Sequence, residues 1–181
     1  RVKNLYNPEV HNAEPFKLPR SKLENFTRCP RCFYLDRRLG VDQPSMPSFT
    51  LNSAVDFLLK KEFDIHRAQR TTHPLMKHYG IDAVPLAHEL MNEWRENFVG
   101  IQYYHRPSNF IITGAVDDIW KDKEGNLMVV DYKATSVNGE IDWQSEYKQG
   151  YRRQLEIYQW LLRQLGYKVA DVGYFVYANG I

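Results

Sequence analysis

The sequence lacks features that would each indicate a particular class of protein. It has only two cysteines in 181 residues, too few for the disulfide framework of a small secreted domain. No apolar run approaches the ~20 residues that a membrane-spanning helix needs, and no secretory signal is recognisable. The net charge is only +2, which neither requires nor excludes nucleic acid as a partner. We therefore expect a soluble, cytoplasmic protein that does not enter a membrane.

The composition allows a sizeable core, because 43% of the residues are hydrophobic and 14% are aromatic. A chain of this length is typical of one compact domain. The pattern predicts a helix capped by Ser21, a connector over residues 43–48, helices over 51–69 and 82–98, and a hairpin joining 99–105 to the strand that begins at Asn109.

Two further segments, residues 109–120 and 126–134, are rich in branched and aromatic residues and predict antiparallel strands joined by a turn. Alternate side chains share one face of a strand, so Asp117 continues an apolar row on the first strand. Asp131 and Lys133 continue such a row on the second. Charged groups in half-buried rows are costly unless they pair or bind a cation. The pattern therefore predicts a site for a hard divalent metal, Mg²⁺ or Mn²⁺.

This arrangement suits phosphodiester hydrolysis, in which a bound divalent metal neutralises developing charge and activates water. We assign metal-ligand roles to Asp117 and Asp131, with the backbone carbonyl of Tyr132 as a further oxygen ligand. Lys133 is predicted to orient the attacking water and to stabilise the charge that develops on the phosphate. An Asp-x-Lys triplet by itself is equally typical of an ion pair at the edge of a sheet.

A helix predicted over residues 145–165 adds two polar groups to this site. Gln154 and Tyr158 are four residues apart and share a helix face. Either side chain could hold a DNA phosphate or Lys133 through a hydrogen bond. The alternative is that Tyr158 is a core residue and Gln154 its polar neighbour.

Basic residues gather in two places, which suggests two surfaces that bracket a phosphate backbone. The amino-terminal group comprises Lys17, Arg20, Lys22, Arg28, Arg31, Arg37 and Arg38. The second flanks the Gln154 helix and includes an aromatic face on which unpaired bases could stack: Lys148, Tyr151, Arg152 and Arg153. The alternative is that these charges are simply solvated and that the aromatic side chain belongs to the core.

Three motifs, Gly114-Ala-Val-Asp117, Asp131-Tyr-Lys133 and Gln154-Leu-Glu-Ile-Tyr158, follow one another with thirteen residues between the aspartates and twenty between Lys133 and Gln154. Upstream, residues 21–35 lead from Ser-x-Leu-x-x-Phe to Cys-Pro and an aromatic pair. Together they resemble the PD-(D/E)xK nuclease superfamily, in its RecB-like branch with the CRISPR-associated Cas-four-like exonucleases. The resemblance implies an α/β fold with a restriction-endonuclease-like core of order αβββαβ, a mixed central sheet flanked by helices, over residues 49–181. Residues 1–48 would form an N-terminal helical arm.

The resemblance also implies an activity: a metal-dependent DNA nuclease acting on single-stranded DNA or DNA ends, in repair, recombination or CRISPR adaptation. A helicase or a CRISPR-adaptation protein would be a partner. The alternative is a catalytically inactive, nuclease-like module that binds DNA or protein. The family usually has a further metal ligand in a Gly-x-x-x-His setting. Here that stretch reads Asn52-Ser-Ala-Val-Asp56, so Asp56 stands where the histidine is expected. Glu62 and His66 on the same predicted helix are other candidates for this ligand, and the alternative for Asp56 is an ordinary surface acid.

The two cysteines form Cys29-Pro-Arg-Cys32, which has the spacing of a metal-ligand pair. A tetrahedral zinc or an iron–sulfur cluster normally needs four ligands. Some members of the resembled family close an iron–sulfur cluster with three further cysteines near the carboxyl end, and a fragment would lack them. For this chain we predict that Cys29 and Cys32 are small packing residues and that no cluster forms. A structural zinc or iron–sulfur protein would instead contain stoichiometric metal.

Overall fold

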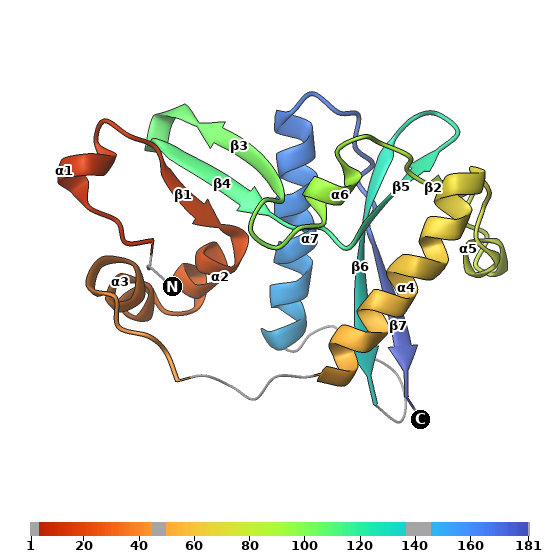
Figure 1. The fold of residues 1–181 in the computed structure, drawn as a ribbon, viewed down its shortest axis with the longest axis horizontal. Coiled ribbons are helices and arrows are strands. Elements are labelled where there is room, and N and C mark those ends of the chain that lie inside the picture. The colour runs from red at the N-terminus through yellow and green to blue at the C-terminus, as the bar shows by residue number, and fades with distance from the viewer. Residues whose placement is uncertain (1–3, 45–49, 137–145, 181) are drawn as a thin grey trace.

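The computed structural model describes residues 4–44, 50–136 and 146–180 and contains two sheets (Figure 1). The first has the strand order β1 (Phe16–Pro19), β4 (Phe110–Gly114) and β3 (Ile101–His105), with β1 parallel and β3 antiparallel to β4. The second has the order β2 (Ala83–Pro85), β5 (Asp118–Asp122), β6 (Leu127–Thr135) and β7 (Tyr174–Asn179). In the second sheet only the pairing of β6 with β7 is parallel.

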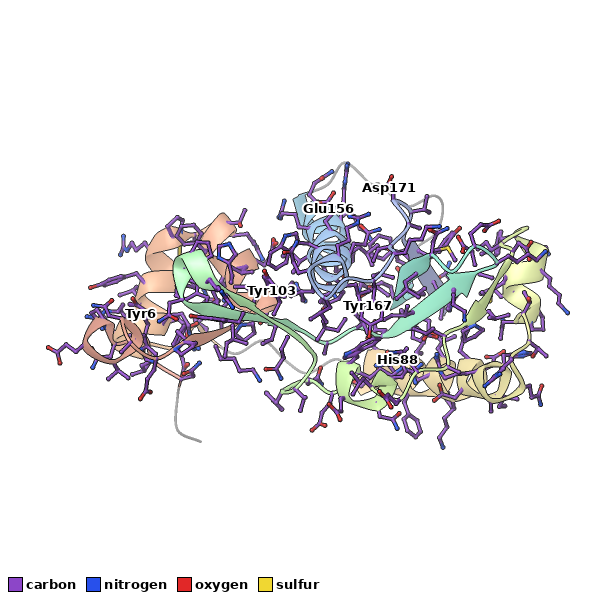
Figure 2. All side chains as sticks on the ribbon, turned by 90° about the horizontal axis from the view of Figure 1, so that it is seen from above. Tyr6, His88, Tyr103, Glu156, Tyr167 and Asp171 are labelled. Atoms are coloured by element: carbon purple, nitrogen blue, oxygen red, sulfur yellow. A yellow bond between two sulfur atoms is a disulfide. The ribbon has the colours of Figure 1, made fainter. Side chains whose placement is uncertain are left out.

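The helices differ greatly in length. They are α1 (Pro8–His11), α2 (Arg20–Arg28), α3 (Pro30–Leu39), α4 (Thr50–Gln69), α5 (Pro74–His78), α6 (Met91–Trp94) and α7 (Glu146–Gln164), with a 3-10 turn η1 at Arg106–Ser108. The two long helices, α4 and α7, lie on opposite sides of the four-stranded sheet, as the view from above shows (Figure 2). Across the described ranges, no helix combines the length and apolar character needed to cross a bilayer.

Alternation along β5 and β6 gives each long helix its own hydrophobic core. Val129 of β6 packs in the same cluster as Leu161 of α7, whereas its neighbour Val130 packs in the same cluster as Phe63 of α4. All four side chains are fully buried. Burying one such side chain stabilises the fold by roughly 1.5–3 kcal/mol. Both helices are therefore held firmly against the two faces of the sheet that carries the motif residues.

The predicted α/β class and the core order of helix, strands, helix and strand are confirmed. The mixed sheet between α4 and α7 corresponds to the predicted central sheet. The predicted strands at 99–105 and 126–134 appear as β3 and β6, and the predicted helices at 51–69 and 145–165 as α4 and α7.

One predicted strand is in fact two. Residues 109–120 form β4, which ends at Gly114, and β5, which begins at Asp118 in the other sheet. A Cβ atom at Gly114 would collide with the Tyr158 ring, so the backbone passes close to α7 at this point. Val116 then donates a backbone hydrogen bond to Trp94 at 3.0 Å instead of to a strand. Asp117 therefore stands at a break between sheets and not in a continuous apolar row.

Two other local predictions are wrong. The predicted helix at 82–98 is strand β2 followed by the short helix α6. Pro85 interrupts the helical pattern, and the backbone N–H of Leu86 donates a hydrogen bond to the Ile119 carbonyl at 2.9 Å, which continues the sheet. The apolar spacing from Leu86 to Trp94 reflects burial in the core without a continuous helix. Helix α2 begins at Arg20 after Pro19 and has no side-chain cap from Ser21.

The amino-terminal segment is built into the fold. Strand β1 pairs with β4 along four residues, beginning with Phe16 opposite Phe110. Glu24 of α2 also accepts hydrogen bonds from Arg153 of α7 at 2.6 and 2.9 Å. The predicted boundary between arm and core at 48–49, together with residues 45–48 of the predicted connector, lies outside the described residues.

Candidate active site

Asp117 lies immediately before β5, at the point where the neighbouring strand β6 extends beyond the end of β5. The pairing of β5 with β6 ends at Asp118 and Val130. Just beyond this pair, the Asp117 Oδ2 accepts a hydrogen bond from the Tyr132 backbone N–H at 2.9 Å. The N–H and C=O groups of one strand residue point toward the same neighbour. The Tyr132 carbonyl therefore faces the same side of β6 as Asp117, and its role as a metal ligand stays a prediction.

Asp131 is fully buried beside this edge and is tied to α7. Its Oδ1 accepts a hydrogen bond from Gln154 Nε2 at 2.7 Å, and its Oδ2 is ion-paired with Lys133 Nζ. Gln154 Nε2 also lies 3.2 Å from the Tyr158 hydroxyl. The structure thus brings together the predicted residues Asp117, Asp131, Lys133, Gln154 and Tyr158. Tyr158 is a core residue, 3% exposed, as the alternative interpretation expected, and its predicted role at the substrate stays a prediction.

The electrostatics of Asp131 are set first by its burial and then by the second carboxyl group, Asp117, beside it. Burial, followed by the charge of Asp117 and a hydrogen-bond contact with it, raises the pKa of Asp131 to about 6 although Lys133 acts to lower it. Burial also raises the pKa of Tyr158. A buried carboxyl group whose charged form is disfavoured, as that of Asp131 is, is typical of a functional site that receives a cation.

Lys60 of α4 is a site residue that the sequence interpretation missed. Its Nζ lies 2.8 Å from Asp56 Oδ2 and 3.3 Å from Asp117 Oδ1, so one ammonium bridges the two carboxylates. Burial raises the pKa of Asp56, and the charge of Asp117 adds to this, even though Lys60 opposes both. The spacing of four residues between Asp56 and Lys60 was the available signal, because such pairs meet on a helix surface.

The metal-ligand prediction can be compared with this geometry. Among the described residues, no three His, Cys, Asp or Glu side chains are grouped closely enough to hold a metal ion. The donor types nevertheless fit Mg²⁺ or Mn²⁺, since carboxylates and a carbonyl are the oxygen ligands these ions prefer. Asp117 and Asp131 are already in contact, whereas Asp56 would have to exchange Lys60 for the ion. The other two candidate ligands on α4 are engaged elsewhere: Glu62 is hydrogen-bonded to His73, and His66 is hydrogen-bonded to Thr71.

The residues predicted to bind DNA divide into two pairs. Lys133 Nζ lies 4.6 Å from the centre of the Tyr151 ring, and Lys148 Nζ lies 5.2 Å from the same centre. Tyr151 and Lys148 therefore border the candidate active site. Arg153 instead joins α7 to Glu24, and Arg152 makes an exposed ion pair with Glu156 at 2.9 Å.

The cysteine prediction requires correction. Cys29 and Cys32 are bonded to each other as a disulfide and are not two separate packing residues. Cys29 caps the start of α3, and its Sγ accepts a hydrogen bond from the Cys32 backbone N–H at 3.1 Å. The first turn of a helix brings residues three apart onto one side, which explains the pairing.

Comparison with known proteins agrees with this geometry. A family model described as the PD-(D/E)XK nuclease superfamily matches residues 55–179, more than half of the chain. The match includes every residue placed in the site above, from Asp56 and Lys60 to Tyr158. A search of the curated proteins finds no match.

Proposed function

Because this chain belongs to the PD-(D/E)XK nuclease superfamily, we propose that it is a Mg²⁺- or Mn²⁺-dependent deoxyribonuclease that hydrolyses phosphodiester bonds. The observation that carries the proposal is the contact between Asp117 and the buried Asp131, with Lys133 ion-paired to the second carboxylate. A structural ion pair at a sheet edge would need one carboxylate. A second one beside it raises the electrostatic cost unless a further cation binds there.

Each residue of the site has a role that its contacts support. A bound divalent metal would supply charge neutralisation and an activated water, held by the carboxylates of Asp117 and Asp131, the Tyr132 carbonyl and, once it leaves Lys60, Asp56. Lys133 presents its ammonium to the substrate phosphate and is kept in place by Asp131 and the Tyr151 ring.

Gln154 and Tyr158 act one step further from the substrate. Gln154 fixes the orientation of Asp131 by donating to Oδ1, and the Tyr158 hydroxyl lies beside the same amide group. Fixing a buried ligand in one rotamer reduces the reorganisation that metal binding and turnover would need.

We propose single-stranded DNA or DNA ends as the substrate. Lys148 and Tyr151 support this, because a cation and an aromatic ring beside Lys133 suit a backbone phosphate and an unpaired base. The resemblance of the motifs to RecB-like and Cas-four-like nucleases supports a cytoplasmic role in repair, recombination or CRISPR adaptation, with a helicase or adaptation protein as partner.

The test is an incubation of the purified protein with labelled linear single-stranded, linear double-stranded and circular single-stranded DNA. Mg²⁺, Mn²⁺ or EDTA is present in parallel reactions. We expect linear single strands to be degraded with either metal and to stay intact in EDTA. Circular DNA that resists cleavage would indicate a requirement for ends. Lys133→Met, which keeps the length of the side chain without its charge, is expected to be inactive.

One observation favours a second candidate, a module that binds DNA without cutting it. Lys60 already bridges Asp56 and Asp117, and a permanent bridge of this kind would exclude a metal. Under that alternative, DNA stays intact with both metals while binding is retained, and the nuclease proposal is then wrong.

The pKa of Asp131 predicts how metal binding depends on pH. Its value of about 6 means that a proton competes with the metal for the carboxylate below this pH. Affinity for Mn²⁺ should fall by about tenfold per pH unit below 6 and level off above it. Calorimetric titration from pH 5 to 7.5 measures this. Asp131→Asn should remove the dependence, and a flat profile in the wild type would contradict the assignment.

A further inference from the structure

Arg20, the first residue of α2, lies next to the candidate active site. The carbon at the centre of its guanidinium is 6.0 Å from the centre of the Tyr158 ring, and its charge acts to lower the pKa of that tyrosine. Tyr158 in turn lies against Gln154, which holds Asp131. A positive charge from the amino-terminal segment thus reaches within two side chains of the predicted metal ligand.

The contacts of Arg20 leave part of its hydrogen-bonding capacity unused. Its Nε is buried and has no hydrogen-bond partner among the described residues. Arg20 contacts Tyr158 through the ring, at the outer limit of a cation–π contact, and through a hydrogen-bond contact, but neither contact pairs its Nε. A planar guanidinium with an unused donor is well suited to the oxygens of a phosphate, which it can bind through two parallel bonds.

Arg20 also marks the inner end of a groove. It lines a cavity of about 170 Å³ together with Tyr158. Pro19, Ser21, Asn97 and Thr113 line both this cavity and a larger one of about 750 Å³. The two cavities therefore adjoin along these residues, and we call the pair, which leads from Tyr158 toward the amino-terminal segment, the arm groove.

The arm groove has an excess of positive charge. Lys17, Lys22 and Arg37 line its larger part, with Asp42 as the acidic residue in the wall. Lys22 and Arg37 share one buried carboxylate, Asp36, at 2.6 and 2.7 Å. Together with Arg20, the groove therefore has four cations against two carboxylates. Such a surplus in a concave surface attracts polyanions.

An aromatic side chain completes the groove. Phe98 lines its larger part and is 65% exposed. An exposed ring beside a row of cations gives a stacking face for an unpaired base. The backbone carbonyl of the same residue accepts a hydrogen bond from Lys17 Nζ at 3.0 Å, which keeps this cation at the groove wall.

We propose that the arm groove binds a single DNA strand and that Arg20 holds the phosphate nearest the active site. The identification of the strand as substrate rests on the proposed nuclease function. The proposal makes the amino-terminal segment part of the substrate-binding surface, and it explains why a half-buried arginine with an unpaired Nε is placed beside Tyr158.

Arg20→Gln tests the proposal with a fluorescein-labelled dT20 oligonucleotide in EDTA, where no cleavage occurs. Binding is measured by fluorescence anisotropy over a series of salt concentrations. We expect binding about tenfold weaker or more at low salt, and a slope of log K against log[salt] that is shallower by about 0.7, the value for one lost phosphate contact on a single strand. Arg20→Lys should restore the slope and only part of the affinity.

Two further variants keep the test decisive. Lys121→Gln removes an equal charge from an exposed position on β5 that lines neither cavity, and it should bind like the wild type. Lys17→Gln removes a second groove cation and should also lower the slope. If Arg20→Gln fails to fold, an unchanged slope for Lys17→Gln overturns the proposal. Wild-type affinity and slope in a folded Arg20→Gln protein also overturn it.

The outcome can be separated from that of the nuclease test. If the wild type cleaves DNA but Arg20→Gln binds normally, the nuclease function stands and the arm groove proposal is wrong. If the wild type cleaves nothing with either metal while Arg20→Gln binds weakly, the groove is supported as a DNA-binding site and the nuclease proposal fails.

Discussion

Asparagine in place of Asp131 is expected to slow DNA cleavage by on the order of a thousandfold without unfolding the protein. The side chain is 1% exposed and keeps its shape in the variant. Its Oδ1 position can still accept the hydrogen bond of Gln154. What is lost is a negative charge beside Asp117 and the ion pair that holds Lys133. Both the metal affinity and the orientation of the ammonium should therefore fall.

The stability of the same variant distinguishes loss of chemistry from loss of fold. The native state binds the Asp131 proton more tightly than the unfolded chain, because the native pKa is about 6 against an ordinary value of 3.8. The contribution of Asp131 to the free energy of unfolding therefore falls as the pH rises from about 4 to 6, and it stays unfavourable above pH 6. Asparagine removes that cost, so the thermal midpoint at pH 7.5 should be no lower than in the wild type.

Single-turnover cleavage assays and thermal unfolding measure the two effects on one preparation. Glu156→Gln, an exposed change on α7, is the matched control and should leave both unchanged. Cleavage by Asp131→Asn within tenfold of the wild type would show that Asp131 does not take part in the reaction.

The site illustrates which parts of a structure a sequence can predict. Alternation placed Asp131 and Lys133 on one face of β6, and helical spacing placed Gln154 and Tyr158 on one face of α7. The structure brings these four side chains together. These predictions succeeded because each depends only on the period of one regular element, and both elements are long.

Other features depend on contacts between elements, which no local period encodes. The break between β4 and β5 follows from the close approach of Gly114 to the Tyr158 ring, about forty residues away in the sequence. The bridge from Lys60 to Asp117 joins α4 to the sheet edge in the same way. The arm groove combines walls from β1, α2, α3 and β4 with the Asn97 and Phe98 segment. Packing between distant segments decides all three.

Alanine in place of Asp118, the residue after Asp117, is expected to cost about 3–5 kcal/mol of unfolding free energy. Its carboxylate is fully buried on the α4 side of the sheet. It accepts hydrogen bonds from Arg67 at 2.5 Å and the Tyr132 hydroxyl at 2.7 Å, and Arg95 Nη2 lies 3.2 Å away. Burial alone would lower the pKa of Arg95, but Asp118 and Asp64 raise it overall. Without Asp118, two guanidinium groups are left with the half-exposed Asp64.

Urea unfolding of Asp118→Ala, with the slope against denaturant checked for constancy, measures this cost. Tyr132→Phe removes one hydrogen bond to the same carboxylate and should cost only about 1 kcal/mol. Glu124→Ala, at an exposed turn after β5, should cost little. A loss below about 1 kcal/mol for Asp118→Ala would contradict the ion-pair account. This cluster anchors the start of β5 to α4, and so it supports Asp117 in its position against Tyr132. We therefore expect the folded fraction of Asp118→Ala to cleave DNA more slowly as well.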